Sequence, residues 1–239
     1  MRWYPWFDKT LLVMGDPTGV DGKEINVDPR TILKNNISLL ETKGLKAFCA
    51  SEMECYLLNE TPKSAHDKGF VNLETKHRTM HPETLIRTSE DEELLGPLRS
   101  NLELADIPVE SVKAEYAPGQ IEINLAYTDA LAAADRHVIF KTGTKEESLK
   151  QNLIATFMAK PYPDSAGNGL HAHVSVLDDA GRNIFNDGSD EGSDQLRHAI
   201  AGTLDLLPES MAIFAPNVNS FRRFAPNLYL SLIHISEPT

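Results

Sequence analysis

Hydrophobic and polar positions follow a helical period in some stretches of the chain and alternate with a period of two in others. The clearest helical pattern covers residues 29–43, where Asp28 is placed to cap the helix, Pro29 stands in its first turn and Gly44 ends it. The following residues, 44–60, alternate as the residues of a strand do. The pattern therefore predicts a helix followed directly by a long strand.

The rest of the chain divides into further helices and short strands. Helical patterns cover residues 90–107, interrupted near Gly96 and Pro97, residues 128–141, and residues 193–207, ending near Pro208. Strand patterns cover residues 11–16, 107–127 on both sides of a turn at Pro118 and Gly119, 155–161 and 170–176. Residues 61–88, which are charged and contain two prolines, are predicted to form a long loop. Because strands and helices do not alternate regularly, we expect a single α+β domain with a largely antiparallel sheet.

The strand pattern near residue 170 carries polar side chains at alternate positions, in the stretch GNGLHAHVSVLDD. Successive side chains of a strand point to opposite faces. One face would carry His171, His173 and Ser175, and the other, expected to be buried, would carry Leu170, Ala172, Val174 and Val176. By itself, such a polar face is as typical of a solvated strand as of a binding site.

Two other predicted strand regions carry acidic faces. Glu52 and Glu54 share one face of the strand at 44–60, and Glu115 and Glu122 stand on either side of the Pro-Gly turn. Adjacent carboxylates repel one another unless water or a cation relieves the repulsion. If these faces belong to one sheet, the four carboxylates can converge with His171 on a site of mainly oxygen ligands. Such a site favours Mg²⁺ or Mn²⁺, in two or more positions, over structural zinc.

Composition and simple motifs indicate which partners, location and mode of nucleotide binding to expect. The chain has 35 acidic and 23 basic residues and a formal charge of -12, which disfavours nucleic acid and anionic membrane surfaces as partners. Its apolar runs are short and the N-terminus does not resemble a signal peptide, so we expect a cytoplasmic protein. The sequence contains no phosphate-binding GxxxxGK[ST] loop. Any nucleotide would have to be held by metal ions and side chains.

Four segments in this order, ASEMECYLL, KAEYAPGQIEINL, TFMAKPYPDSAGNGLHAHVS and NSFRRFAPN, resemble the catalytic domain of the glutamine synthetase family. The resemblance covers roughly residues 10–230. It implies a curved, mostly antiparallel sheet flanked by helices and incomplete at both ends, with residues 1–230 forming part of the catalytic domain and no N-terminal β-grasp domain. Residues 231–239 resemble a translated sequencing adaptor and are expected to be non-native.

The resemblance implies an ATP-dependent ligase that forms γ-glutamyl phosphate and then an amide with ammonia or a primary amine, on divalent metal ions. The implied metal ligands are Glu54, Glu115 and Glu122 for one ion, and Glu52 and His171 for the other. Side chains that would contact ATP are Glu110, Tyr127, His173 and Ser175. The implied substrate-binding residues are Gly167, His171 and Arg223, of which Arg223 would pair with the glutamate carboxylate as the catalytic residue.

Two positions depart from the ammonia-using pattern of the family. Tyr229 stands where that pattern has a glutamate that captures ammonium, and Ala166 replaces an asparagine that contacts glutamate. These departures resemble the branch that couples glutamate to polyamines or other primary amines. The resemblance also implies a ring-shaped homo-oligomer, and predicts that this chain alone is inactive.

Two other function classes remain open from the sequence. A cupin-like metal-dependent enzyme could use the His-x-His strand, but it would place a glutamate a few residues after His173, where the chain has Leu177, Asp178 and Asp179. A non-catalytic structural relative would be expected to have lost the acidic residues of the predicted metal site, and these are all present.

Overall fold

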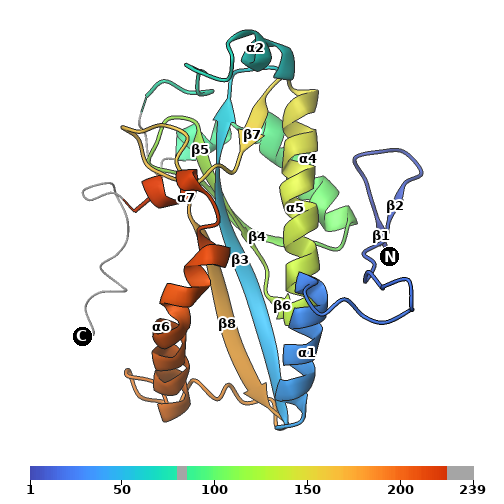
Figure 1. The fold of residues 1–239 in the computed structure, drawn as a ribbon. Coiled ribbons are helices and arrows are strands. Elements are labelled where there is room, and N and C mark those ends of the chain that lie inside the picture. Colours follow the sequence, from blue (N-terminus) through green and yellow to red (C-terminus); the bar gives the residue numbers. More distant parts are fainter. Residues whose placement is uncertain (80–84, 225–239) are drawn as a thin grey trace.

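A long central strand organises the fold. The computed structural model describes residues 1–79 and 85–224, and in it β3 (Leu45–Leu58) pairs antiparallel with every strand beside it (Figure 1). The sheet has the order β4-β5-β3-β6, and β7 and β8 also pair with β3. The other strands are β4 (Val109–Ala114), β5 (Gln120–Leu125), β6 (Thr128–Asp129), β7 (Ile154–Thr156) and β8 (Leu170–Asp178). The predicted α+β class with an antiparallel sheet is confirmed.

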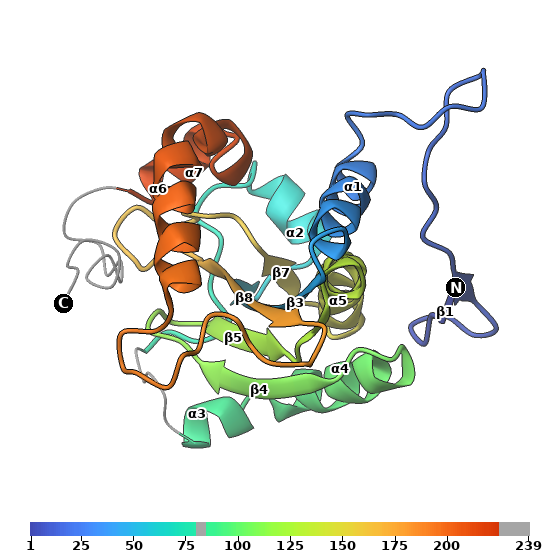
Figure 2. The ribbon, with the colours of Figure 1, turned by 90° about the horizontal axis from the view of Figure 1, so that it is seen from below.

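Helices flank this sheet. The longer ones are α1 (Pro29–Glu41), α4 (Glu92–Leu104), α5 (Ala130–Lys150) and α6 (Asp194–Phe214), and the short ones are α2 (Pro62–Asp67), α3 (Leu85–Ser89) and α7 (Val218–Arg222). A separate hairpin joins β1 (Arg2–Trp3) and β2 (Leu11–Leu12). In both views α6 lies on the other side of β8 from α1 and α5 (Figures 1 and 2). Among the described residues, no helix is both long and apolar enough to cross a membrane.

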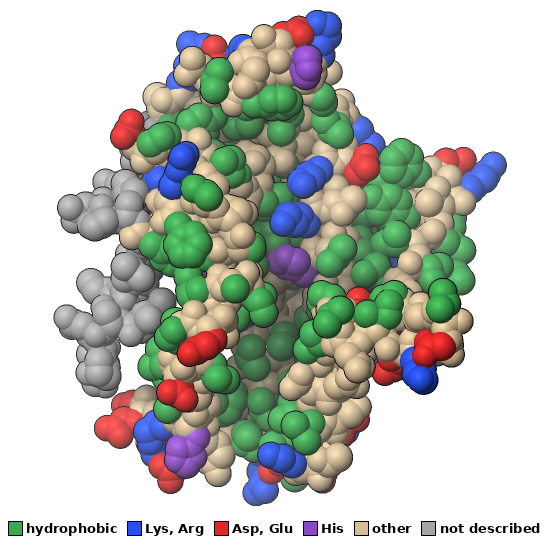
Figure 3. All heavy atoms as spheres, viewed as in Figure 1, with side chains coloured by type: hydrophobic (Ala, Val, Ile, Leu, Met, Phe, Trp, Pro, Cys, Tyr) green, Lys and Arg blue, Asp and Glu red, His purple; other side chains and the backbone are tan. Residues whose placement is uncertain are grey.

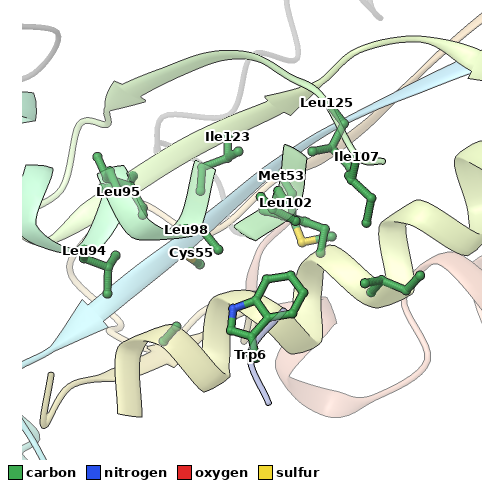
Figure 4. Packing of buried hydrophobic residues seen from close by; sticks show 14 of the residues in the cluster. Trp6, Met53, Cys55, Leu94, Leu95, Leu98, Leu102, Ile107, Ile123 and Leu125 are labelled. Atoms are coloured by element: carbon green, nitrogen blue, oxygen red, sulfur yellow. The ribbon is translucent and has the colours of Figure 1, made fainter. Parts of the chain in front are cut away.

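The hydrophobic core lies between one face of the sheet and the helices α4 and α5. Met53 and Cys55 of β3 point into it, as the alternation of the strand requires, while Glu52 and Glu54 point to the other face. Figure 4 shows Leu94, Leu98 and other α4 side chains packed against this face, with Trp6 entering from the N-terminal segment. The core therefore fixes β3 in place and leaves its acidic face available for a site.

A predicted interruption at Pro97 and a predicted helix end at Pro208 are wrong because both prolines are accommodated within helices. Pro97 lies inside α4, where it cannot hydrogen-bond to the Glu93 carbonyl, but the Gln151 side chain donates to that oxygen at 2.5 Å. Pro208 lies inside α6, which contains no buried residue, so the carbonyl that it leaves free can bind water. Neither helix is interrupted.

The segment 61–88 is not a plain loop. Thr61 and Ser64 form a capping box that starts α2, with Pro62 in its first turn, and α3 follows at Leu85–Ser89. The strands predicted at 11–16 and 155–161 are shorter than expected. Helix α2 was not predicted because a reciprocal cap between a threonine and a serine is less distinctive in sequence than one in which a glutamate stands three residues after the cap.

The helix predicted to end at residue 141 continues to Lys150. Gly143 does not end it, because the Trp6 ring packs against this glycine and its carbon atoms occupy the space that a side chain at position 143 would fill. We expect Gly143→Ala to lower the free energy of unfolding by about 1–3 kcal/mol, since a methyl group must displace the indole. Gly202, in α6, has open space around it. The control Gly202→Ala should instead raise stability by about 0.5–1 kcal/mol in urea unfolding. Equal effects of both changes would contradict this packing.

The apolar face of β8 is largely exposed, contrary to the prediction. Val176 is buried, but Leu170 and Val174 are 57% and 54% exposed. None of the residues of α6 is buried either. Figure 3 shows the result as a hollow lined by hydrophobic side chains beside α6. The alternation was read correctly, but no described element covers this part of the strand.

Candidate active site

The strand register brings the acidic residues and histidines to one face. Glu52 of β3 lies opposite Asn124 of β5 on one side and His171 of β8 on the other, and Glu54 lies opposite Glu122 of β5. Cross-strand neighbours of this kind are about 4.5–5.5 Å apart at their Cβ atoms. Residues that are far apart in the sequence therefore form two adjacent rows across the sheet.

Glu52 is held by both histidines of β8. Its Oε1 lies 2.6 Å from Nδ1 of His171, and its Oε2 lies 3.4 Å from Nε2 of His173. Burial alone would raise the pKa of Glu52, but the interactions with His171 and His173 outweigh burial and lower it. When His171 donates from Nδ1, its Nε2 keeps a lone pair, which is the form of imidazole that binds metals.

One carboxylate oxygen of Glu54 accepts hydrogen bonds from the protein, and the other remains available to a ligand. Its Oε2 accepts hydrogen bonds from the Gly169 amide and the Gln120 side chain, both at 2.9 Å. A methyl group on Gly169 would lie 2.9 Å from Oε1 of Glu54 and 3.4 Å from Nε2 of His171. These two potential ligand atoms therefore approach the same point above Gly169. Burial raises the pKa of Glu54, and the neighbouring Glu115 carboxylate raises it further.

Glu115 and Glu122 share a cation within the chain itself. The Lys113 ammonium lies 3.3 Å from Oε1 of each carboxylate. Glu122 is only 3% exposed, and burial raises its pKa, as does the charge of Glu52. This part of the site therefore favours a positive charge, and Lys113 supplies one where a metal ion could lie.

The predicted metal ligands are gathered on one face but are not closed around a single point. Within residues 1–79 and 85–224, no three histidine, cysteine or acidic side chains already have the geometry to hold a metal ion. The donor set nevertheless fits a divalent cation, because burial raises the pKa values of Glu54 and Glu122 and a lysine lies between Glu122 and Glu115. Carboxylate oxygens with one imidazole suit Mg²⁺ or Mn²⁺.

A cavity of about 570 Å³ lies next to Glu52. The predicted nucleotide-contacting residues all line it, namely Glu110, Tyr127, His173 and Ser175. The Tyr127 side chain is 72% exposed and meets Phe48 edge-on, with the ring centroids 6.3 Å apart. Four residues from three separate chain regions are thus brought to one cavity beside the acidic rows.

Arg223, which follows α7, lies directly on Gly167. A side chain at Gly167 would collide with Arg223 and with the Ala159 carbonyl, so only glycine fits. The Nε of Arg223 donates to the Asn168 carbonyl at 3.3 Å, while its NH1 is buried and has no hydrogen-bond partner among the described residues. An acceptor such as a carboxylate would give this NH1 group a hydrogen-bond partner.

Two polar residues of the site were missed in the sequence. Gln120 and Lys113 lie among the glutamates, and strand alternation places Gln120 on the same face as Glu122.

Ala166, one of the two positions that depart from the ammonia-using pattern, is held through its backbone. Its carbonyl accepts a hydrogen bond from the Tyr56 hydroxyl at 2.6 Å, and burial raises the pKa of Tyr56 to about 12. Tyr229 and the tail at 231–239 lie outside the described residues.

Comparisons with known proteins show which family the chain belongs to. Residues 26–234 match the family described as glutamine synthetase, catalytic domain. The chain is 35% identical over 223 residues to a glutamate–isopropylamine ligase of a Pseudomonas species, covering 92% of this chain and 49% of that protein. It is 36% identical over 226 residues to type-1 glutamine synthetase 2 of Dictyostelium discoideum, covering 93% and 43%.

A solved structure titled as a GmaS/ADP complex superposes with a TM-score of 0.76 at 26% identity, covering 89% of this chain and 48% of that one. The chain thus spans about half the length of the relatives that it matches. The sequence match extends over the strands and loops that carry Glu52, Glu122, His171 and Arg223. The chain therefore belongs to the glutamine synthetase family, and residues 26–234 correspond to its catalytic domain.

Proposed function

We propose that the protein is an ATP-dependent ligase that forms an amide between the γ-carboxylate of glutamate and ammonia or a primary amine, through γ-glutamyl phosphate. The observation that carries this proposal is the convergence of Glu52, Glu54, Glu122 and His171 on one sheet face, beside the cavity that contains His173. Membership of a family whose relatives are named as amine ligases and glutamine synthetases supports the same reaction.

Two Mg²⁺ or Mn²⁺ ions would be held on the acidic face. Glu54, Glu115 and Glu122 would bind one ion, and Glu52 and His171 the other. The ions would supply positive charge that neutralises the phosphate oxygens during phosphoryl transfer. In this arrangement Lys113 would give up its place between Glu115 and Glu122 when a metal ion binds.

The remaining residues would bind and orient the two substrates. Glu110, Tyr127, His173 and Ser175 would contact ATP in the cavity of about 570 Å³ that they line, and a structural neighbour is described as an ADP complex. The NH1 of Arg223, which has no hydrogen-bond partner among the described residues, would bind a carboxylate of glutamate, while the bare backbone at Gly167 lets the substrate approach. Holding the acceptor carboxylate in line with the phosphate is the main task left to the protein.

Other parts of the proposal concern the whole protein. We propose that residues 1–230 form part of the catalytic domain, that the protein works as a ring-shaped homo-oligomer, and that it is cytoplasmic. The alternatives are less well supported: no glutamate follows His173 at the position that a cupin-like enzyme needs, and a non-catalytic relative would have no use for all four carboxylates.

Phosphate release from ATP by the whole protein, since this chain alone is predicted to be inactive, tests the reaction and identifies the acceptor. We expect release only when glutamate, Mg²⁺ or Mn²⁺, and an amine are present together. Ammonia, isopropylamine, putrescine and ethanolamine should be assayed in parallel, with glutamate omitted as a control, and the preferred amine should give the highest kcat/KM. Absence of release with every amine, or release that does not depend on glutamate, would rule out the ligase.

A further inference from the structure

Gln120 is a buried polar side chain to which the proposed reaction assigns no role. It is 1% exposed and stands at the start of β5, opposite Tyr56 of β3 and two residues before Glu122. A buried amide is costly unless its donors and acceptor are satisfied. The partners of Gln120 therefore indicate what its position contributes.

The amide group of Gln120 joins three parts of the site. Its Nε2 donates toward Oε2 of Glu54 at 2.9 Å, and toward the Gly167 carbonyl and Oδ1 of Asn168, both at 3.0 Å. Its Oε1 accepts from the Ala117 amide at 3.2 Å. Three acceptors surround the nitrogen and a donor faces the oxygen, so the orientation of the amide is determined by its surroundings.

These contacts connect the metal-facing side of the site to its substrate-facing side. Oε2 of Glu54 is fixed by Gln120 and by the Gly169 amide, while Oε1 lies near the same point above Gly169 as Nε2 of His171. The same Gln120 nitrogen holds the Gly167 backbone, on which Arg223 rests. Asn168 is fixed in turn by its bonds to the Thr156 and Met158 carbonyls at 3.2 and 2.8 Å.

We infer that Gln120 is a positioning residue that presents Oε1 of Glu54 to a divalent cation and holds the Gly167 backbone under Arg223 at the same time. This inference rests on the proposed metal role of Glu54. A glutamine suits the position because its amide donates to a carboxylate without adding a charge that would compete with the cation. Hydrogen-bond partners of ligating carboxylates commonly change metal affinity by about 10–100-fold when they are replaced.

The test compares Gln120→Met with Tyr56→Phe. The Tyr56 hydroxyl also holds this loop, through Ser165 and the Ala166 carbonyl, but it has no hydrogen bond to Glu54. We expect Gln120→Met to weaken Mn²⁺ binding, measured by electron paramagnetic resonance, by at least about 10-fold. Tyr56→Phe should change it by less than about 3-fold, even if both variants lose similar stability in urea. Equal Mn²⁺ affinity of Gln120→Met and the unchanged chain would overturn the inference.

Hydrogen exchange at the Gly169 amide gives a second readout that needs no metal. Since this amide donates to Glu54, its exchange should accelerate in Gln120→Met and not in Tyr56→Phe. If the unchanged chain bound no Mn²⁺, the assignment of the metal ligands would fail. The role of Gln120 would be refuted separately if the Gly169 amide exchanged at the same rate in Gln120→Met as in the unchanged chain. Should Gln120→Met not fold, Gln120→Asn, which adds no charge but whose amide is one methylene shorter, carries the same comparison.

Discussion

Replacing Glu122 with glutamine is expected to abolish turnover of the whole protein and to weaken Mn²⁺ binding by at least about 100-fold, while the folded chain keeps its stability. Glu122 is 3% exposed, and burial together with the Glu52 charge raises its pKa. A neutral amide of the same shape removes this unfavourable charge and still accepts hydrogen bonds from Asn124 and Lys113. The loss should therefore fall on metal binding and not on folding.

Mn²⁺ titration and urea unfolding, run on the same samples, separate these two effects. Glu103→Gln is the matched control, since Glu103 is an exposed residue of α4 away from the site. It should change neither quantity. If Glu122→Gln bound Mn²⁺ as tightly as the unchanged chain, Glu122 would not be a ligand. A large drop in stability without a change in affinity would assign it a purely structural role.

Asp91→Asn is expected to destabilise the fold by about 3–5 kcal/mol. Asp91 is fully buried and accepts from Lys76 and His77 at 2.7 and 2.8 Å on one oxygen, and from Arg87 at 2.8 Å on the other. These contacts tie the segment after α2 to the start of α4. Asparagine would remove the counter-charge of the Lys76 ammonium and leave the buried Arg87 guanidinium only the more distant Glu90 carboxylate, at 3.8 Å.

The same change has a predicted pH dependence. Burial alone would raise the pKa of Asp91, but the hydrogen bonds from Lys76 and His77 outweigh burial and lower it. A carboxyl whose pKa is lowered by folding stabilises the protein above the unfolded value of about 4, and this stabilisation disappears as the pH falls through the folded-state pKa. The difference between Asp91→Asn and the unchanged chain should thus be constant above about pH 5 and shrink below pH 4.

Thermal unfolding across this pH range measures the difference. Asp106→Asn serves as the control, because Asp106 pairs with Arg2 and Arg136 but its side chain is 76% exposed. An exposed pair of this kind contributes less than about 1 kcal/mol. Comparable losses in the two variants would show that the buried cluster around Asp91 is no more important than a surface ion pair.

Strand alternation was enough to predict which candidate residues share a face of the sheet. The period of two in residues 44–60 separates Glu52 and Glu54 from Met53 and Cys55, and the structure places the two sets on opposite faces. The register could not be read in the same way, because pairing of β8 and β5 with opposite edges of β3 depends on contacts between distant segments. The position of Arg223 on Gly167 likewise depends on α7, which no local pattern connects to that loop.

The errors share a physical cause. Pro97 and Gly143 usually weaken a helix, but their effects are offset by Gln151 and Trp6, which are far away in the sequence. Gln120 was missed because it is uncharged and directly follows the Pro-Gly turn, and only its three acceptors reveal its role. Local sequence patterns therefore predicted which residues face the site better than they predicted what holds those residues in place.

Anomalous X-ray scattering at the manganese edge, from crystals grown with Mn²⁺, would test the central claim most directly. The account predicts peaks bounded by Glu54, Glu115 and Glu122 and by Glu52 and His171, with the Lys113 ammonium displaced. Manganese peaks only elsewhere on the chain, or a Lys113 that still bridges Glu115 and Glu122 at saturating Mn²⁺, would contradict it.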